Sequence, residues 1–214
     1  MRIRILTAAL LSAGLFAMPG LATPATAQTI IDEWPNVKAP PAPALTAVTV
    51  DPKTTALLVL DLIKQTCNSD RRPRCVASLP KEKKLLDAAR ANGLLVVYSV
   101  VSGISTAADI LPDVTPQANE PVVKGELDKF VGSDLDKILK DEGIKTVIVA
   151  GVASDGAILY TGTTAFLHGY QTIIPVDGVS ASSVYTEQSI VYHFTSAPVI
   201  GGKVILTRID MIKF

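Results

Sequence analysis

The sequence has little of several residue types that mark common classes of binding site. Among its 214 residues there are two histidines, two cysteines and one tryptophan. Lysine and arginine together number 20, as do aspartate and glutamate, so neither sign of charge is in excess. A chain without a basic excess lacks the electrostatic signature of a surface for nucleic acid or anionic lipid. We therefore expect no nucleic acid among its partners.

Long apolar runs are also missing, because no stretch reaches the roughly 20 residues that a membrane-spanning helix needs. The shorter run Ile5–Phe16 follows Arg2 and Arg4 and precedes the small residues Ala25–Ala27. This order is typical of a secretory signal peptide. We expect residues 1–27 to be a cleaved signal, with a retained membrane anchor as the alternative. The mature protein is then secreted or periplasmic and makes no membrane contact.

The two cysteines lie close together in the segment TCNSDRRPRC, as Cys67 and Cys75. An oxidising compartment favours their pairing, and the residues between them are of the types that form turns. We expect a disulfide between Cys67 and Cys75. Two free thiols and a single reactive thiol are the alternatives.

Proline and alanine dominate the stretch WPNVKAPPAPALTAV, which predicts an extended arm over residues 28–52. From residue 53 to residue 214 the chain alternates between continuous apolar runs and segments with helical spacing. The runs predict strands at 56–60, 94–101, 146–150, 172–176 and 203–207, and the spacing predicts helices at 81–92, 133–142, 157–167 and 186–195. This alternation indicates an α/β domain with a parallel sheet between helices.

Three features fall where such sheets form sites, at the carboxyl ends of their strands. Asp61 directly follows the run LLVL, Lys124 follows two valines, and the small-residue segment Gly151–Ala157 joins a strand to a helix. A partly buried aspartate is suited to proton transfer, and a lysine beside it would keep it charged. The small-residue turn can aim backbone N–H groups at a developing oxyanion. Each feature also has an ordinary alternative, as a helix cap, a surface lysine or a tight connection.

Together these segments resemble the isochorismatase-like cysteine hydrolases, which include nicotinamidases, N-carbamoylsarcosine amidohydrolases and isochorismatases. The resemblance rests on LLVLD, VVKGELDKF and VIVAGVASDGAILYTGTTA, in family order, and on TIIPVDGVSA and LTRIDMI near the end. It covers roughly residues 54–212. It implies a three-layer fold whose six-stranded, mainly parallel sheet has helices on both faces.

The resemblance also implies the site residues. Asp61 corresponds to the family's acid or base and Lys124 to its partner. Ala157 stands at the position of the nucleophilic cysteine. A non-proline cis peptide is expected between Val152 and Ala153, with the N–H groups of Ala153 and Ala157 forming the oxyanion hole.

Alanine at the nucleophile position has consequences, because covalent catalysis of this type requires a thiolate. The alanine is consistent with an engineered substitution, with a natural branch that works without the nucleophile, or with a binding protein that has lost catalysis. Some isochorismatases lack the cysteine and hydrolyse a vinyl ether by protonating it, for which an aspartate and a lysine suffice in principle. The histidines of the nicotinamidase-type metal site are also missing, so we expect no metal and no cofactor.

The leading hypothesis is a hydrolase that acts on a small amide, carbamoyl or enol-ether substrate through Asp61 and Lys124. The alternative is a non-catalytic protein of the same fold that binds a small molecule. A third hypothesis is an assembly protein whose Pro-rich arm mediates contacts. Homo-oligomerisation is common in the family, and we expect it here.

Overall fold

The computed structural model describes residues 29–214, which fall into two units. The first, up to Ala39, contains the short helix α1 (Ile30–Glu33) and a 3₁₀ turn at Trp34–Asn36. The second, Pro40–Phe214, holds the remaining elements. The expected signal peptide lies outside the described residues, so its cleavage and the resulting location stay predictions.

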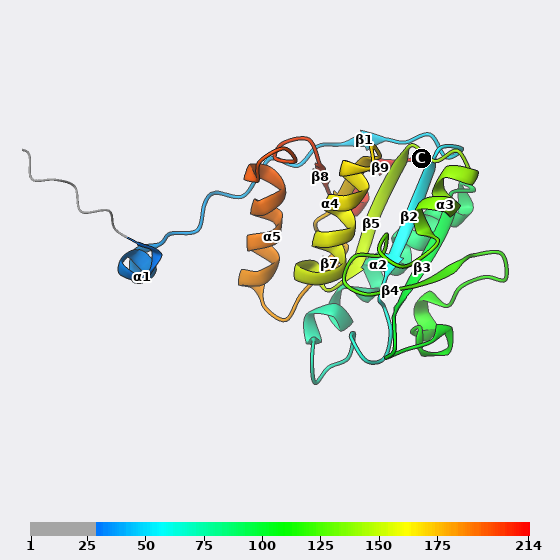
Figure 1. Cartoon of the computed structure of the whole chain (residues 1–214), viewed down its shortest axis with the longest axis horizontal. Coiled ribbons are helices and arrows are strands. Elements are labelled where there is room, and N and C mark those ends of the chain that lie inside the picture. The colour runs from blue at the N-terminus through cyan, green and yellow to red at the C-terminus, as the bar shows by residue number, and fades with distance from the viewer. Residues whose placement is uncertain (1–28) are drawn as a thin grey trace, which may run out of the picture. The chain divides into compact units, whose positions relative to one another are not determined.

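The second unit is built on a seven-stranded sheet in which all neighbouring strands are parallel (Figure 1). Six strands lie in the order β4-β3-β2-β5-β6-β8, and the short β7 pairs with β5. The strands of this unit are β1 (Val48–Thr49), β2 (Thr55–Leu60), β3 (Leu95–Val101), β4 (Val122–Gly125), β5 (Thr146–Val152), β6 (Gln171–Pro175), β7 (Val179–Ser180), β8 (Ile205–Thr207) and β9 (Ile212–Lys213). The predicted α/β class is confirmed, with β7 as an additional strand.

Helices lie against both faces of this sheet. They are α2 (Pro73–Ala91), α3 (Leu135–Asp141), α4 (Leu159–Leu167) and α5 (Val184–Ser196), with a π-helical turn at Ser154–Ile158 leading into α4. Leu85 and Leu86 of α2 pack in one apolar cluster, whereas Leu139 of α3, Ala165 of α4 and Phe194 of α5 pack in the other. The architecture therefore has three layers, with α2 on one face and the other three helices opposite.

The alternation of side chains along β2 explains why that strand is a continuous apolar run. Leu57 and Val59 belong to the cluster under α2, while Ala56, Leu58 and Leu60 belong to the opposite cluster. All six residues of β2 are buried. A central parallel strand that is covered on both faces has no position left for a polar side chain facing water.

The Pro-rich arm is divided between the two units, since the compact unit begins at Pro40 rather than at residue 53. Val48 and Thr49 pair in parallel with Ile212 and Lys213, forming a separate two-stranded sheet. Thr46 also donates a backbone hydrogen bond to the Leu206 carbonyl, at 2.9 Å. The second half of the arm is thus part of the folded domain.

Helix α2 differs most from its sequence-based prediction, because it begins at Pro73 and not near residue 81. Pro73 fits its first turn, where no intrahelical N–H partner is needed. Pro80 lies inside the helix. Because proline lacks a backbone donor and is disfavoured inside helices, its presence in the sequence argues against a helix that begins before residue 81. The helix therefore starts directly after Arg71 and Arg72, inside the segment that the two cysteines enclose.

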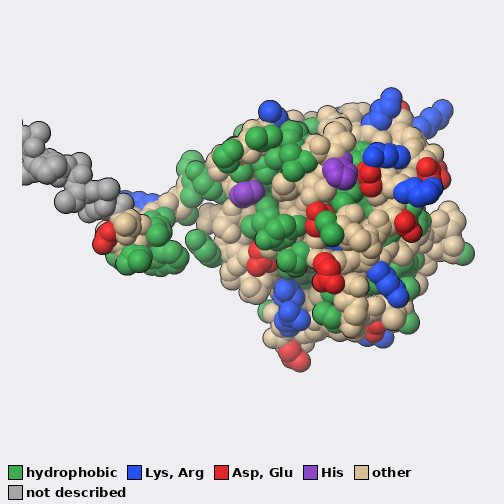
Figure 2. Space-filling view, in the orientation of Figure 1, with side chains coloured by type: hydrophobic (Ala, Val, Ile, Leu, Met, Phe, Trp, Pro, Cys, Tyr) green, Lys and Arg blue, Asp and Glu red, His purple; other side chains and the backbone are tan. Residues whose placement is uncertain are grey.

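The surface over α4 and α5 carries exposed hydrophobic side chains, which are visible among the green atoms of Figure 2. They include Tyr160, Leu167, Val184, Tyr185 and Tyr192. Exposed apolar groups of this kind often mark contact surfaces, but self-association of the chain stays a prediction. No helix among residues 29–214 combines the length and apolar character needed to span a bilayer.

Candidate active site

A cavity of about 380 Å³ opens at the carboxyl ends of the central strands. Asp61 follows β2, and Val152 ends β5, so the two central strands deliver these residues to the same edge of the sheet. The lining residues come from four segments: Asp61, Gln65, Thr66, Arg71, Arg72, Val101, Ile104, Glu126, Leu127, Val152, Ala153, Asp155, Gly156 and Ala157. The position agrees with the rule that parallel sheets bind ligands beyond the carboxyl ends of their strands.

Asp61 is the most buried acidic side chain of this cavity, with 5% of its surface exposed. Its φ of 53° lies in the left-handed region, which aspartate tolerates better than most residues and which turns the chain away from the strand. The Ser99 hydroxyl donates to Asp61 Oδ1 at 2.7 Å, while the Asp61 N–H donates to Ser99 Oγ at 3.2 Å. Thr66 donates to the Asp61 carbonyl. These contacts fix both the backbone and the carboxylate.

The lysine that pairs with this carboxylate is Lys129, with 2.8 Å between its Nζ and Asp61 Oδ2. Lys129 is completely buried, and its ammonium also donates to the carbonyls of Gly125 and Glu126, at 3.2 and 2.6 Å. Three acceptors therefore satisfy its three protons. The assignment of Lys124 as the partner of Asp61 is wrong: Lys124 is exposed and forms no ion pair within residues 29–214.

The position of β4 at the edge of the sheet explains why Lys124 is unsuitable. Side chains alternate along a strand, and because Val123 and Gly125 are buried, Lys124 between them faces solvent. Beyond Gly125 the chain turns back, and the Lys129 N–H donates to Thr161 Oγ1 of α4 at 3.0 Å. This contact helps to fix the segment from which the Lys129 side chain reaches Asp61.

Burial raises the pKa of the Asp61 carboxyl above its ordinary value. The Lys129 ammonium and the Ser99 hydroxyl oppose this rise, because both stabilise the charged form. Burial is the larger of the opposing effects. The cavity thus contains a carboxyl group that is held in place by two donors and is easier to protonate than an exposed aspartate.

The turn after β5 brings the backbone of the nucleophile position into the cavity. The peptide bond between Val152 and Ala153 is cis, which confirms that prediction. Gly151 has a φ of +120°, and a Cβ there would lie 2.1 Å from the Leu60 carbonyl oxygen, so only glycine fits. Ala157 is 3% exposed and lines the cavity together with Asp61.

Backbone donors are present at the same turn. Gly156 and Ile158 both donate to the Ala153 carbonyl, at 3.0 and 3.2 Å, which closes the π-helical turn. The N–H of Ala153 itself has no acceptor among residues 29–214. An oxyanion hole formed by Ala153 and Ala157 is compatible with this arrangement and stays a prediction.

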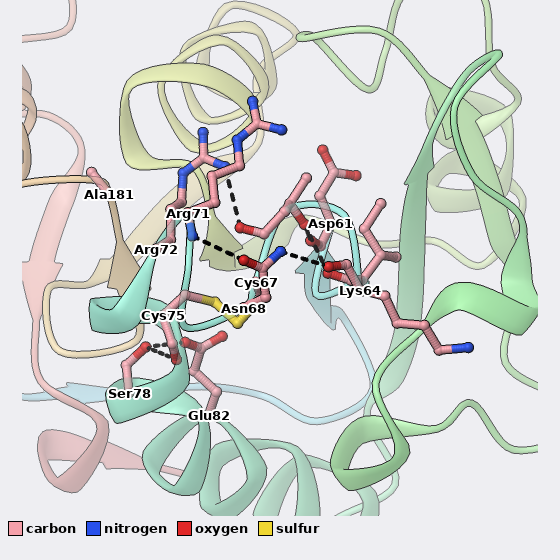
Figure 3. Close-up of a disulfide and its surroundings, with 12 residues drawn as sticks. Asp61, Lys64, Cys67, Asn68, Arg71, Arg72, Cys75, Ser78, Glu82 and Ala181 are labelled. Carbon is pink, nitrogen blue, oxygen red and sulfur yellow. Dashed lines mark hydrogen bonds between the residues drawn. A yellow bond between two sulfur atoms is a disulfide. The ribbon is translucent and has the colours of Figure 1, made fainter.

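The loop from Thr66 to Pro73 forms another wall of the cavity and is closed by the predicted disulfide. Cys67 and Cys75 are bonded, with their Cα atoms 5.4 Å apart. Because the chain has two cysteines in all, neither is left as a free thiol. Figure 3 shows Arg71 and Arg72 extending from this loop on the side away from Ser78 and Glu82.

Sequence reasoning missed several residues of this site: Lys129, Ser99, Thr66, Arg71 and Arg72. Ser99 has a detectable signal, because it is a polar residue within the apolar run LVVYSVV of β3 and lies opposite Leu60 in the sheet register. A hydroxyl in a buried strand needs a hydrogen-bond partner, and Asp61 follows Leu60. The loop residues carry no comparable pattern.

The histidines lie outside the cavity lining. His168 contacts Asp136 at 3.2 Å between Nδ1 and Oδ1 and packs against the Phe130 ring, and His193 is on α5. Within residues 29–214, no group of three or more His, Cys, Asp or Glu side chains is arranged to hold a metal ion.

The chain matches the Isochorismatase domain family over residues 55–203. The isochorismatase family protein YwoC of Bacillus subtilis is 29% identical over 162 residues, a match that covers 65% of this chain and 84% of that protein. Streptothricin hydrolase of Streptomyces noursei is 33% identical over 151 residues, covering 63% of this chain. The latter match spans only 57% of that hydrolase.

Solved structures show the same fold. An isochorismatase-like hydrolase from Alkaliphilus metalliredigens superposes with a TM-score of 0.66 at 22% sequence identity. The match covers 73% of this chain and 95% of that one. At this level of identity the likeness concerns the arrangement of the elements.

Proposed function

Because the chain belongs to the isochorismatase family, we propose that it is a hydrolase which works without a thiol, using Asp61 as its acid. The substrate is a small molecule that fits a cavity of about 380 Å³. Of the amide, carbamoyl and enol-ether groups that the family suggests, an enol ether fits this site best. The observation that carries the proposal is the buried Asp61 carboxyl beside Lys129, in a cavity whose nucleophile position holds a methyl group.

The absence of a free thiol favours an enol ether over an amide or a carbamoyl compound as the substrate. Both cysteines form the disulfide, so covalent attack by a cysteine thiolate is not available at any position of the chain. Hydrolysis of an unactivated amide then depends on water alone. An enol ether is different, because its slow step is protonation of carbon by an acid.

The proposed reaction begins with protonated Asp61. Its proton passes to the β-carbon of the enol ether, a C–H bond forms, and the α-carbon becomes an oxocarbenium ion. Water adds to that carbon and returns a proton to the Asp61 carboxylate. The resulting hemiketal breaks its C–O bond to release an alcohol and a ketone, so the overall change is the addition of one water.

Lys129 sets the charge of Asp61 in this scheme and does not need to touch the substrate. Its ammonium stabilises the carboxylate that remains after proton transfer. Burial acts in the opposite direction and raises the pKa of Asp61. A poised acid requires both effects, since an unpaired buried carboxyl would not release its proton and a fully solvated pair would not hold it.

Loss of catalysis is the second candidate, and the Ala157 methyl is the observation that favours it. In that case the cavity binds a small molecule and does not convert it. Ligand-dependent thermal stabilisation without product formation would identify this function.

The experiment is a turnover screen of the purified protein on small enol ethers, with primary amides and carbamoyl compounds for comparison. Asp61→Asn is the matched variant, because asparagine also tolerates the left-handed backbone at this position. We expect product from an enol ether and a loss of at least about 100-fold in Asp61→Asn, within the range for general acids. Equal turnover by both proteins would contradict the proposal.

A further inference from the structure

The disulfide-closed loop presents two arginines to the cavity. Arg71 and Arg72 both line it, and both guanidinium groups extend from the loop in Figure 3. Asn68 organises the loop: its side-chain oxygen accepts from the Arg71 N–H at 2.9 Å, and its carbonyl accepts from the Arg72 N–H at 2.8 Å. The buried Cys67–Cys75 bond then joins the loop to the first turn of α2. The cationic wall of the cavity is therefore a fixed part of the structure.

Both guanidinium groups keep hydrogen-bond donors that have no acceptor in the described chain. Arg72 Nη1 donates to the Thr66 carbonyl at 3.2 Å, and Arg71 Nη1 reaches the Gln65 carbonyl at 3.4 Å. No carboxylate among residues 29–214 lies within salt-bridge distance of either side chain. The buried Nε of Arg72 has no hydrogen-bond partner at all in the described chain. A guanidinium offers five donors, so most of those on Arg72 remain free.

Arg72 is also in an unfavourable electrostatic setting. Burial lowers its pKa, and the positive charge of Arg71 lowers it further, while Asp155 only partly compensates. Arg72 is partly withdrawn from water and has the exposed Arg71 as its neighbour, and an anion that binds beside the two guanidinium groups stabilises both charges. A planar carboxylate matches the fork of an arginine in two parallel hydrogen bonds.

Acidic residues also line the cavity, and their positions decide which ligand charge is favoured. Glu126 and Asp155 are exposed, whereas Arg72 is half-buried. Charges in contact with water are screened more strongly than buried ones. The buried Lys129 ammonium has an acceptor for each of its three protons, whereas Arg72 Nε has none in the described chain. The least compensated charge in the cavity is therefore positive and belongs to Arg72.

From this arrangement we propose that Arg72, with Arg71 beside it, forms a carboxylate-binding subsite, and that the physiological substrate is a small organic anion. The proposal rests on the proposed function in one respect, since it assigns the charge of the compound on which Asp61 acts. It makes Arg72 a specificity-determining residue and the disulfide a support for its position. It applies equally to a substrate that is hydrolysed and to a ligand that is only bound.

The test compares ligands that differ in one charge. Oxamate, malonamate and succinamate each carry one carboxylate, and their neutral counterparts are oxamide, malonamide and succinamide. Binding to the unmodified protein is measured by calorimetry and by thermal shift, which require no turnover. We expect at least one half-amide anion to bind at least tenfold more tightly than its neutral diamide. Equal affinities, or no binding of any of the three anions, would overturn the proposal.

Substitutions at Arg72 test whether its positive charge causes the preference for the anion. We expect Arg72→Gln to abolish the preference for the anion and Arg72→Lys to retain part of it, because lysine keeps the charge without the fork. Lys64→Gln, at an exposed lysine of the adjoining segment outside the cavity lining, should leave the preference unchanged. A preference that survives in Arg72→Gln contradicts the assignment. Anion binding without turnover would retain this subsite and refute only the hydrolase, whereas turnover of neutral enol ethers alone would do the reverse.

Discussion

Two buried carboxyl groups in this domain have opposite surroundings. Asp61 has a lysine, a serine and an open cavity around it. Glu82, on α2, is 4% exposed and has one side-chain partner, the Ser78 hydroxyl at 2.7 Å from its Oε1. Its Oε2 has no partner in the described chain. Figure 3 draws Glu82 and Ser78 next to the disulfide, on the side opposite to the arginines.

The comparison shows that burial alone does not make an acid functional. Burial raises the pKa of Glu82 to about 8, and the hydrogen bond with Ser78 opposes it only weakly. Ser78 Oγ also lies 3.0 Å from the Cys75 carbonyl, and one hydroxyl proton cannot serve both acceptors. A neutral Glu82 resolves this, because its own proton can be donated to Ser78. Glu82 thus acts as a neutral polar group of the interior, whereas Asp61 has a partner that allows it to ionise.

Removing the partner of Asp61 should produce the largest effect. Lys129→Met leaves a buried carboxylate without its ammonium, and we expect a loss of about 3–5 kcal/mol in the free energy of unfolding. Urea denaturation at pH 7 measures it. Lys124→Met, at the exposed lysine five positions earlier, is the control and should change stability by less than about 0.5 kcal/mol. Similar losses in both variants would contradict the pairing, while Asp61→Asn added to Lys129→Met should recover part of the loss.

Replacing Glu82, the buried acid without an ion-pair partner in the described chain, should raise the free energy of unfolding. Glu82→Gln keeps the shape and a donor for Ser78 but cannot ionise, so we expect the variant to be more stable by roughly 2 kcal/mol at pH 8. The folded-state pKa is about 8 and the ordinary value is 4.5. Wild-type stability should therefore fall as the pH rises from 4.5 to 8, because the unfolded chain releases the proton first.

The variant should lack this component of the pH dependence, which denaturation series between pH 4 and 9 will show. Glu142→Gln, at an exposed glutamate, is the matched control and should follow the wild type throughout. A wild-type profile that is flat between pH 4.5 and 8 would show that Glu82 is ionised in the folded state.

A cysteine thiol introduced into the cavity should show a smaller effect, a lowered pKa. Ala157→Cys leaves the disulfide intact, so it introduces the one titratable thiol of the chain. We expect its pKa to fall about one unit below the free value of about 8.5, because Lys129 and the start of α4 favour the thiolate. Iodoacetamide labelling across pH measures it. Ala91→Cys, at the exposed last residue of α2, should titrate at or above 8.5, and equal values for the two thiols would count against the site.

The sequence predicts those parts of this molecule that depend on periodicity. Continuous apolar runs identify β2, β3 and β5, and Asp61 is found because it directly follows one of them. Glu82 also has a signal in the sequence: it lies three, four and seven positions before Leu85, Leu86 and Ala89, on the same buried helical face. A polar residue at such a position must be neutral, paired or functional.

Lys129 has no such signal. Its role depends on how the segment after β4 turns back, which a contact with Thr161, 32 residues later, helps to fix. Lys124 is predicted from its place at a strand end, but β4 is an edge strand in which Lys124, between the buried Val123 and Gly125, faces solvent. Long-range loop geometry of this kind cannot be read from local patterns, and the same holds for the arginines of the disulfide-closed loop.

Asp61 can act as an acid only if burial raises its pKa by more than Lys129 lowers it, and titration of the Asp61 carboxyl measures this balance. Carbon-13 NMR of the side-chain carboxyls, with Asp61→Asn to assign the signal, gives the midpoint in the folded protein. We expect a pKa above the ordinary value of about 3.9, because burial outweighs the ammonium and the hydroxyl. A midpoint at or below 3.9 would contradict it, since Asp61 would then be a permanent carboxylate with no proton to give.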